Sequence, residues 1–111
     1  MKSSSHMENK MDIKQSKQGN HGIVSLGGRF DFNAHREFKD AYTVLLSDGA
    51  IQSLEVNLSK VDYLDSSALG MLLMLRERAE AANKKISLSS PNPTVIKILD
   101  IANFSKLFTI N

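Results

Sequence analysis

The order of apolar and polar residues along the chain predicts short strands that alternate with helices. Residues 53–59 alternate polar and apolar without a break, which is typical of a strand with one buried face and one partly covered face. A sheet covered by helices on both sides would show a continuous apolar run in a central strand instead. This segment therefore predicts a sheet whose helices pack mainly on one side.

The N-terminal part of the chain predicts a hairpin followed by a helix. Residues 12–17 are polar and only weakly strand-like, whereas residues 21–26 form a β-branched run that ends at the turn signal Gly27-Gly28. Asn33 is a favourable N-cap for the helix that follows. Four apolar residues then recur at helical spacing: Ala34, Phe38, Ala41 and Leu45.

The C-terminal half predicts two more helices and two more strands. Residues 68–75 are the densest apolar stretch, so this helix start is deeply packed or partly offered to a partner, and Asn83 closes the helix in the left-handed conformation. A strand over residues 86–88 precedes Asn92-Pro93, an N-cap with proline at the first helical position. Residues 107–110 fit a short edge strand. The predicted order is β-β-α-β-α-β-α-β, with right-handed crossovers wherever consecutive strands run parallel.

The size and composition fit one small domain without covalent or metal support. The chain has 111 residues, of which 41% are hydrophobic and 23% charged, as in ordinary globular domains. The absence of cysteine excludes disulfides, thiolate metal sites and thiol catalysis, and it fits a reducing cytoplasm. Residues 1–10 lack an apolar signal core and are interpreted as a tag remnant or disordered N-terminus, with a single domain over residues 11–111.

The positions of the charged, apolar and histidine residues argue against nucleic acid, membrane and metal as partners. The net charge is +2, but Lys84-Lys85 is the only adjacent basic pair, so no basic stripe for nucleic acid is present. No apolar run reaches the length of a membrane span. His21 and His35 are not at metal-ligand spacing and are expected to be surface residues. We therefore expect a cytoplasmic protein with no cofactor, no direct nucleic-acid contact and no membrane contact.

The segment with the most chemical interest joins the predicted central strand to the apolar helix. It reads Val-Asp-Tyr-Leu-Asp-Ser-Ser-Ala-Leu-Gly over residues 61–70. Ser66 and Ser67 would open a helix, where backbone N–H groups and the helix dipole favour an anion. Gly70 would allow close approach of another backbone, from a neighbouring strand or from a partner. From the residues alone, Asp65 and Ser66 acting only as a helix cap is the simpler interpretation.

This segment, followed by Met-Leu-Leu, resembles the signature of the STAS domain family, which includes the anti-sigma factor antagonists. Upstream, Leu-Gly-Gly-Arg-Phe-Asp over residues 26–31 is similar to the family's Gly-x-Leu-Asp turn. Downstream, residues 92–99 and 102–110 are similar to its closing helix and strand. The resemblance covers residues 12–111. It implies an α/β, STAS-like fold, with a small mixed sheet of four to five strands and helices packed mainly on one face.

The resemblance also implies a function. In the family, the unmodified antagonist binds an anti-sigma factor, often a serine kinase, and so releases the sigma factor. That kinase phosphorylates the second serine of the Asp-Ser-Ser pattern, which breaks the complex, and a PP2C-type serine phosphatase resets it. By position, Ser67 would be phosphorylated, although Ala68 stands where many members have glycine. The implied partner-binding and switch residues are Asp31, Asp65, Ser66, Ser67 and Gly70.

Two other classes of protein remain as alternatives. The first is a constitutive STAS subunit of a stress-sensing scaffold or a lipid-transporter ATPase complex, without a phospho-switch. The second is an enzyme, such as a nucleotide hydrolase or esterase, which the missing Gly-x-Ser-x-Gly elbow and the missing phosphate loop disfavour. The spacing of Asp62 and Asp65 fits turn and cap roles. Met71 and Met74 are most simply core residues, although methionines near a helix start also suit an adaptable partner surface.

Overall fold

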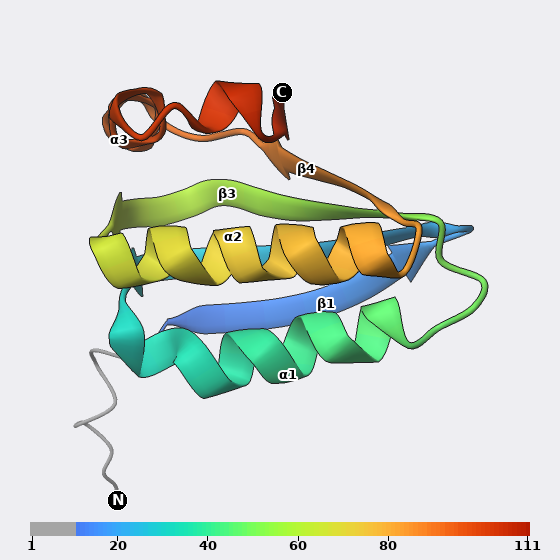
Figure 1. The fold of residues 1–111 in the computed structure, drawn as a ribbon. Helices are drawn as coiled ribbons and strands as arrows, with labels where there is room; N and C mark the ends of the chain where they lie inside the picture. The colour runs from blue at the N-terminus through green and yellow to red at the C-terminus, as the bar shows by residue number, and fades with distance from the viewer. Residues whose placement is uncertain (1–10) are drawn as a thin grey trace, which may run out of the picture.

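A computed structural model of the protein describes residues 11–111, and it has the element order that the sequence predicts. The expected tag remnant or disordered N-terminus lies outside the described residues. The strands and helices are β1 (Asp12–Gln18), β2 (His21–Phe30), α1 (His35–Leu46), β3 (Ser53–Leu64), α2 (Ser66–Ala81), β4 (Lys85–Ser89), α3 (Pro93–Ile101) and β5 (Thr109–Ile110) (Figure 1). Short 3-10 turns precede α1 and follow α3: η2 (Phe32–Ala34) and η3 (Phe104–Lys106).

The five strands form one mixed sheet in sequence order, β1-β2-β3-β4-β5. The hairpin pair β1 and β2 is antiparallel, and every later neighbour is parallel. Parallel neighbours must be joined by crossover segments, and α1, α2 and α3 supply these three connections. The carboxyl ends of β2 and β3 therefore open directly into helical segments at the same end of the sheet.

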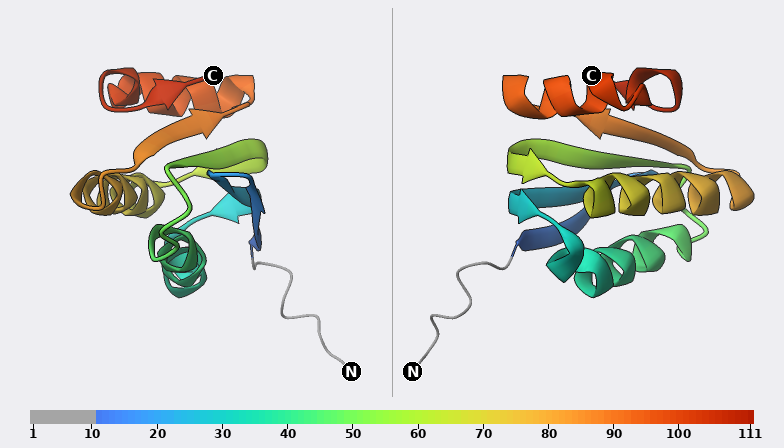
Figure 2. Two further views of the ribbon diagram at one scale, coloured as in Figure 1. Left: turned by 90° about the vertical axis from the view of Figure 1, so that its right-hand side faces the viewer. Right: turned by 60° about the vertical axis from the view of Figure 1, so that its left-hand side comes forward.

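The helices pack on one face of the sheet, as the alternation in residues 53–59 predicts. Leu54, Val56 and Leu58 of β3 are fully buried in a core that also contains side chains of all three helices. The residues between them in β3 are only partly covered. Figure 2 shows α1 and α2 on the same side of the sheet, with α3 near the β4 end. One face is therefore the hydrophobic core and the other is a polar surface.

Strand β2 corrects one sequence-based prediction, because it does not end at Gly27-Gly28. It continues to Phe30, with irregularities in its pairing to β3 around both glycines. Gly28 has a φ of 96°, a left-handed value that glycine adopts without a steric penalty. The glycines thus bend the strand instead of ending it, and the strand carries Phe30 to a partner at the end of β3.

The start of α1 corrects a second prediction. Asn33 is not the N-cap of that helix. Asp31 instead caps the preceding 3-10 turn, and its carboxylate accepts a hydrogen bond from the Asn33 backbone N–H at 2.9 Å. The N-cap position of α1 itself is Ala34, which has no side-chain cap. Elsewhere the helix signals are confirmed: Asn83 has a φ of 61°, and Asn92 caps α3 with proline at its start.

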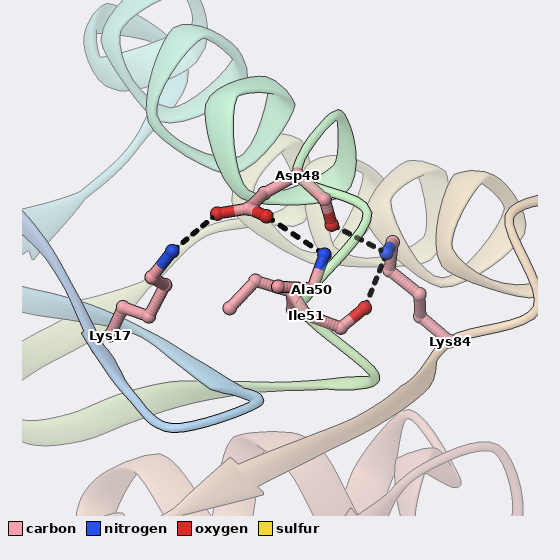
Figure 3. A network of polar contacts seen from close by, with 5 residues as sticks. All are labelled: Lys17, Asp48, Ala50, Ile51 and Lys84. Carbon is pink, nitrogen blue, oxygen red and sulfur yellow. Dashed lines mark hydrogen bonds and ion pairs between the residues drawn. The ribbon is translucent and has the colours of Figure 1, made fainter.

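The amino ends of the parallel strands are joined by a network of charged and backbone groups (Figure 3). The Asp48 carboxylate binds the Lys17 ammonium at 2.7 Å and accepts a hydrogen bond from the Ala50 backbone N–H at 2.9 Å. The Lys84 ammonium donates to the Asp48 carbonyl oxygen at 3.0 Å and also to the Ile51 carbonyl oxygen. This network ties the loop between α1 and β3 to the end of β1 and to the segment before β4.

Candidate functional site

The two aspartates predicted at the site lie at neighbouring strand ends. Phe30 of β2 is paired with Leu64 of β3, and the next backbone N–H, that of Asp65, donates to the Phe30 carbonyl oxygen at 3.3 Å. Asp31 and Asp65 each follow one member of this pair. The sheet register thus brings together the turn after β2 and the segment that opens α2, which are distant in the sequence.

Asp65 is the N-cap of α2. Its backbone is extended, and its carboxylate accepts a hydrogen bond from the Ala68 backbone N–H at 2.8 Å. This is the structural role that Asp takes at many helix starts. The carboxylate fixes where the helix begins, and therefore sets the orientation of the two serines in the first turn.

The two serines of the first turn differ in their surroundings. Ser66 is exposed, whereas Ser67 is half-buried. Among residues 11–111, neither hydroxyl makes a hydrogen bond. The first N–H groups of a helix have no acceptor within the helix, and the helix dipole adds partial positive charge there. The hydroxyls are therefore available to another molecule, in a place where an added anion is electrostatically favourable.

Asp31 is already engaged by its own turn. Besides accepting from Asn33, its carboxylate lies 3.4 Å from the Arg29 side chain. The Arg29 guanidinium also stands over the ring of Tyr63, at 4.7 Å from its centroid. The carboxylate therefore holds the turn after β2 in place, and a cation offsets its charge.

A groove between α1 and α2 begins at Ser67. It has a volume of about 380 Å³, and residues of both helices and of η2 line it: Phe32, His35, Phe38, Lys39, Tyr42, Ser67, Gly70, Met71, Met74 and Arg78. Apart from Gly70, its chain neighbours and the backbone of its own helix, no described atom would lie within 4 Å of a Cβ atom built on Gly70. The expected close approach of a neighbouring strand to Gly70 is therefore wrong, and Gly70 instead leaves the groove open.

Of the two most exposed apolar groups of this groove, Phe32 escaped the sequence interpretation, whereas Met74 was expected most simply in the core, with a partner surface as the alternative. Phe32 is 68% exposed and stacks on His35 with ring centroids 6.0 Å apart. Met71 is buried, as a core residue should be, but Met74 is 47% exposed. One sequence signal does mark Phe32, because it lies outside the helical stripe that Ala34 begins and directly follows a cap residue.

His21 also departs from the expectation of a surface histidine. It is half-buried on the uncovered face of the sheet, with Nδ1 2.7 Å from the Ser53 hydroxyl oxygen and Nε2 2.9 Å from Glu55 Oε1. The Ser89 hydroxyl donates to the other Glu55 oxygen. These hydrogen bonds from His21 and Ser89 lower the pKa of Glu55. The network joins the amino ends of β2 and β3 to Ser89, the last residue of β4, away from the serines of α2.

Within residues 11–111, no cluster of three or more histidine, aspartate or glutamate side chains is arranged to hold a metal ion. No helix in the same part of the chain combines the length and the apolar character needed to span a bilayer.

Comparison with known proteins shows the family. The family model described as "Mlab, STAS domain" matches residues 13–109, so the chain belongs to the STAS domain family. A STAS-domain-containing protein of Pseudomonas aeruginosa (strain UCBPP-PA14) is 46% identical over 86% of this chain and 93% of its own length. The anti-sigma-B factor antagonist of Staphylococcus aureus is 23% identical over 91% of this chain and 93% of its own length.

Solved structures show the same fold at lower sequence identity. The anti-sigma factor antagonist SpoIIAA in its unphosphorylated form is 20% identical, with a TM-score of 0.76 over 90% of this chain and 88% of SpoIIAA. The phosphorylated form of SpoIIAA, a Bacillus cell fate determinant, is 19% identical, with a TM-score of 0.69 over 90% of this chain and 91% of its own. The predicted α/β fold, a mixed sheet with helices mainly on one face, is confirmed.

Proposed function

We propose that this protein is an anti-sigma factor antagonist that exchanges partners when Ser67 is phosphorylated. One observation carries the proposal: Asp65 caps α2 so that the Ser67 hydroxyl, without a hydrogen bond among the described residues, stands at the mouth of an open groove. The family and the resemblance to antagonists of anti-sigma factors over 91% of the chain support it. In this proposal the protein is a cytoplasmic regulator and not an enzyme.

The unmodified protein would bind an anti-sigma factor that is also a serine kinase. In the complex, the Ser67 hydroxyl oxygen takes the γ-phosphoryl group of ATP held by the kinase. ADP leaves, and the hydroxyl proton passes to a base of the kinase. The serine then carries about −1.5 to −2 charge and three strong acceptor oxygens. A PP2C-type serine phosphatase would later hydrolyse the ester with water and restore the hydroxyl.

The free domain tolerates this charge better than the complex does. In the free domain, water and the first-turn N–H groups of α2 solvate the phosphate. In the complex, the phosphate would be desolvated against a surface that fits a neutral hydroxyl, with Asp65 in the same segment and Asp31 at the neighbouring strand end. A coupling of about 3 kcal/mol is enough to lower the affinity for the kinase more than a hundredfold. SpoIIAA has been solved in both states, which supports a fold that accepts the modification.

The test is to map phosphate on the protein isolated from its own cells, with single-serine variants as matched controls. We expect phosphate on Ser67 in the wild type and in Ser66→Ala, and none in Ser67→Ala. As baits, Ser67→Ala should capture the anti-sigma factor and Ser67→Asp should not, while both melt at the wild-type temperature. Phosphate on Ser66 contradicts the site assignment. Equal capture by both baits, without phosphate on either serine, would favour the constitutive STAS subunit.

A further inference from the structure

The groove between α1 and α2 extends well beyond Ser67. Arg78, which also lines it, lies about three helical turns along α2 from Ser67, or about 16 Å at 1.5 Å per residue. The opposite wall is formed by η2 and by α1 from its start to Tyr42. The groove is therefore long enough to hold several residues of another chain, and not only the reacting serine.

The interior of the groove is apolar and its rim leaves apolar side chains in water. Phe38, Tyr42 and Met71 form buried parts of its lining. Phe32 is 68% exposed and Met74 is 47% exposed, although both are large apolar side chains. Their burial in a complex would favour association, because association removes this surface from water.

The charges of the groove have one sign. The described lining residues include the basic side chains Lys39, Arg78 and His35, all exposed, and no carboxylate is among them. Burial raises the pKa of Tyr42, and the charge of Arg78 and its hydrogen bond to Tyr42 offset part of this rise. Since the whole chain carries a net charge of only +2 with 12 acidic residues, this local excess of positive charge is a property of the groove.

We propose that the groove between α1 and α2 binds an amphipathic, acidic segment of the partner protein. Its apolar side chains occupy the space between Phe32 and Met74, and its carboxylates face Lys39 and Arg78. This inference rests on the proposed function and adds to it the chemistry that the partner must present. It also gives phosphorylation a second effect. A phosphate on Ser67 puts negative charge at one end of the same groove, where it competes with the partner's carboxylates for the cations and repels them.

The test uses two synthetic helical peptides and the full chain. Both peptides carry leucine and phenylalanine at the same helical spacing, and their other positions are glutamate in one and lysine in the other. In an NMR titration of the labelled protein at low salt, we expect the glutamate peptide to bind at least tenfold more tightly. It should shift the amide signals of Phe32, Ser67 and Met74. Equal affinity for the two peptides, or shifts confined to the uncovered sheet face, would overturn the proposal.

Matched variants separate the groove from general surface effects. Met74→Ser should weaken glutamate-peptide binding at least fivefold. Leu73 lies on the same helix and is 38% exposed, but it does not line the groove, so Leu73→Ser should leave this binding unchanged. Exchange of both cations, Lys39→Glu with Arg78→Glu, should reverse the preference between the peptides. NMR spectra of each variant verify that it is folded. An unchanged preference in the folded double variant contradicts the electrostatic part of the proposal.

Charge at the serines tests the link to phosphorylation. Ser67→Asp should weaken the binding of the glutamate peptide severalfold. Ser66 does not line the groove, so Ser66→Asp should weaken this binding less. The docking proposal and the phospho-switch fail separately. Phosphate mapped to Ser67 in cells, together with no peptide preference, overturns only the docking. Groove binding with no phosphate on Ser67 in cells supports the docking and overturns the switch.

Discussion

The two ends of the sheet use their polar groups in opposite ways. At the amino ends of the parallel strands, Asp48 and Lys84 make contacts that join the hairpin, the loop after α1 and the segment before β4 (Figure 3). At the carboxyl ends, the Asp31 and Asp65 carboxylates contact only groups of their own turns, and the Ser66 and Ser67 hydroxyls make no hydrogen bond among the described residues. The charged side chains Asp48 and Lys84 thus tie distant segments together at one end, whereas two hydroxyls remain available at the other.

This difference indicates a division of labour within one small domain. Groups that hold the fold together cannot be modified or bound without loss of stability, whereas groups without structural duties can. Ser67 belongs to the second kind, so its modification is expected to change binding with little effect on the fold. Substitutions at the two ends test this contrast directly.

The largest effect on the stability of the fold is expected at the amino end of the sheet, from Lys84→Met. Methionine keeps most of the packing of the lysine stem but removes the ammonium that donates to the Asp48 and Ile51 carbonyl oxygens. Leaving partly buried carbonyl groups without a partner costs about 1–3 kcal/mol. For a domain of this size we expect the melting temperature to fall by at least about 4 °C in differential scanning calorimetry.

Lys85→Met is the matched control for this substitution. Lys85 is the next residue and is exposed at the start of β4. It should melt within about 2 °C of the wild type, since surface substitutions are usually within ±0.5 kcal/mol. If the two variants melted at the same temperature, the network at the amino end would have no special part in stability.

The second effect lies at the carboxyl end, at the helix cap. Asp65→Ala removes the acceptor for the Ala68 N–H and should cost about 1 kcal/mol, or about 4–8 °C in melting temperature. Asp65→Asn should keep most of the cap and most of the stability. Asp62→Ala, at an exposed position of β3, is the control and should melt near the wild type. A loss no larger for Asp65→Ala than for Asp62→Ala would contradict the assigned cap.

The sequence predicted the fold well because its local signals agree with the long-range packing. Strict alternation in residues 53–59 predicted the one-sided packing. Asn83 marked the end of α2 by a left-handed conformation that few other residues favour, and Asn92 marked the start of α3 by its side-chain cap. The start of α1 was wrong because Asp31 and Asn33 are both cap residues, and local propensity does not separate them. The sheet register determines which of the two is the cap, because β2 ends at Phe30 and Asp31 is the next residue.

The site was predicted only in part because much of it depends on which elements pack together. Asp65 and Ser67 are adjacent in sequence and could be identified as one motif. Phe32 and Arg78 face the same groove only after α1 packs against α2, which no local pattern reveals. The half-buried position of His21 was missed for the same reason, because the parallel register of β2 and β3 determines that Ser53 is its partner.

The smallest effect on stability is expected from substitution of two similar aspartates, one at each end of the sheet. Asp48 and Asp31 each accept a hydrogen bond at 2.9 Å from the backbone N–H two residues ahead, and each has a basic partner. The hydrogen bond from Lys17 and that from Ala50 lower the pKa of Asp48. A lowered pKa in the folded state stabilises the fold above the unfolded pKa of about 3.9. This contribution is lost as the pH falls through the folded pKa.

Asp48→Asn should therefore melt below the wild type at pH 7, and the difference should shrink toward zero as the pH is lowered below about 4. Asp31→Asn should melt within about 2 °C of the wild type at pH 7, because asparagine still accepts from Asn33 and the Arg29 pair is longer, at 3.4 Å. Its effect should instead appear in slower phosphorylation of Ser67 or weaker capture of the anti-sigma factor, since the lost charge lies beside the proposed interface. If Asp31→Asn melted early and bound normally, Asp31 would be a structural turn residue like Asp48, and the contrast between the two ends would not extend to it.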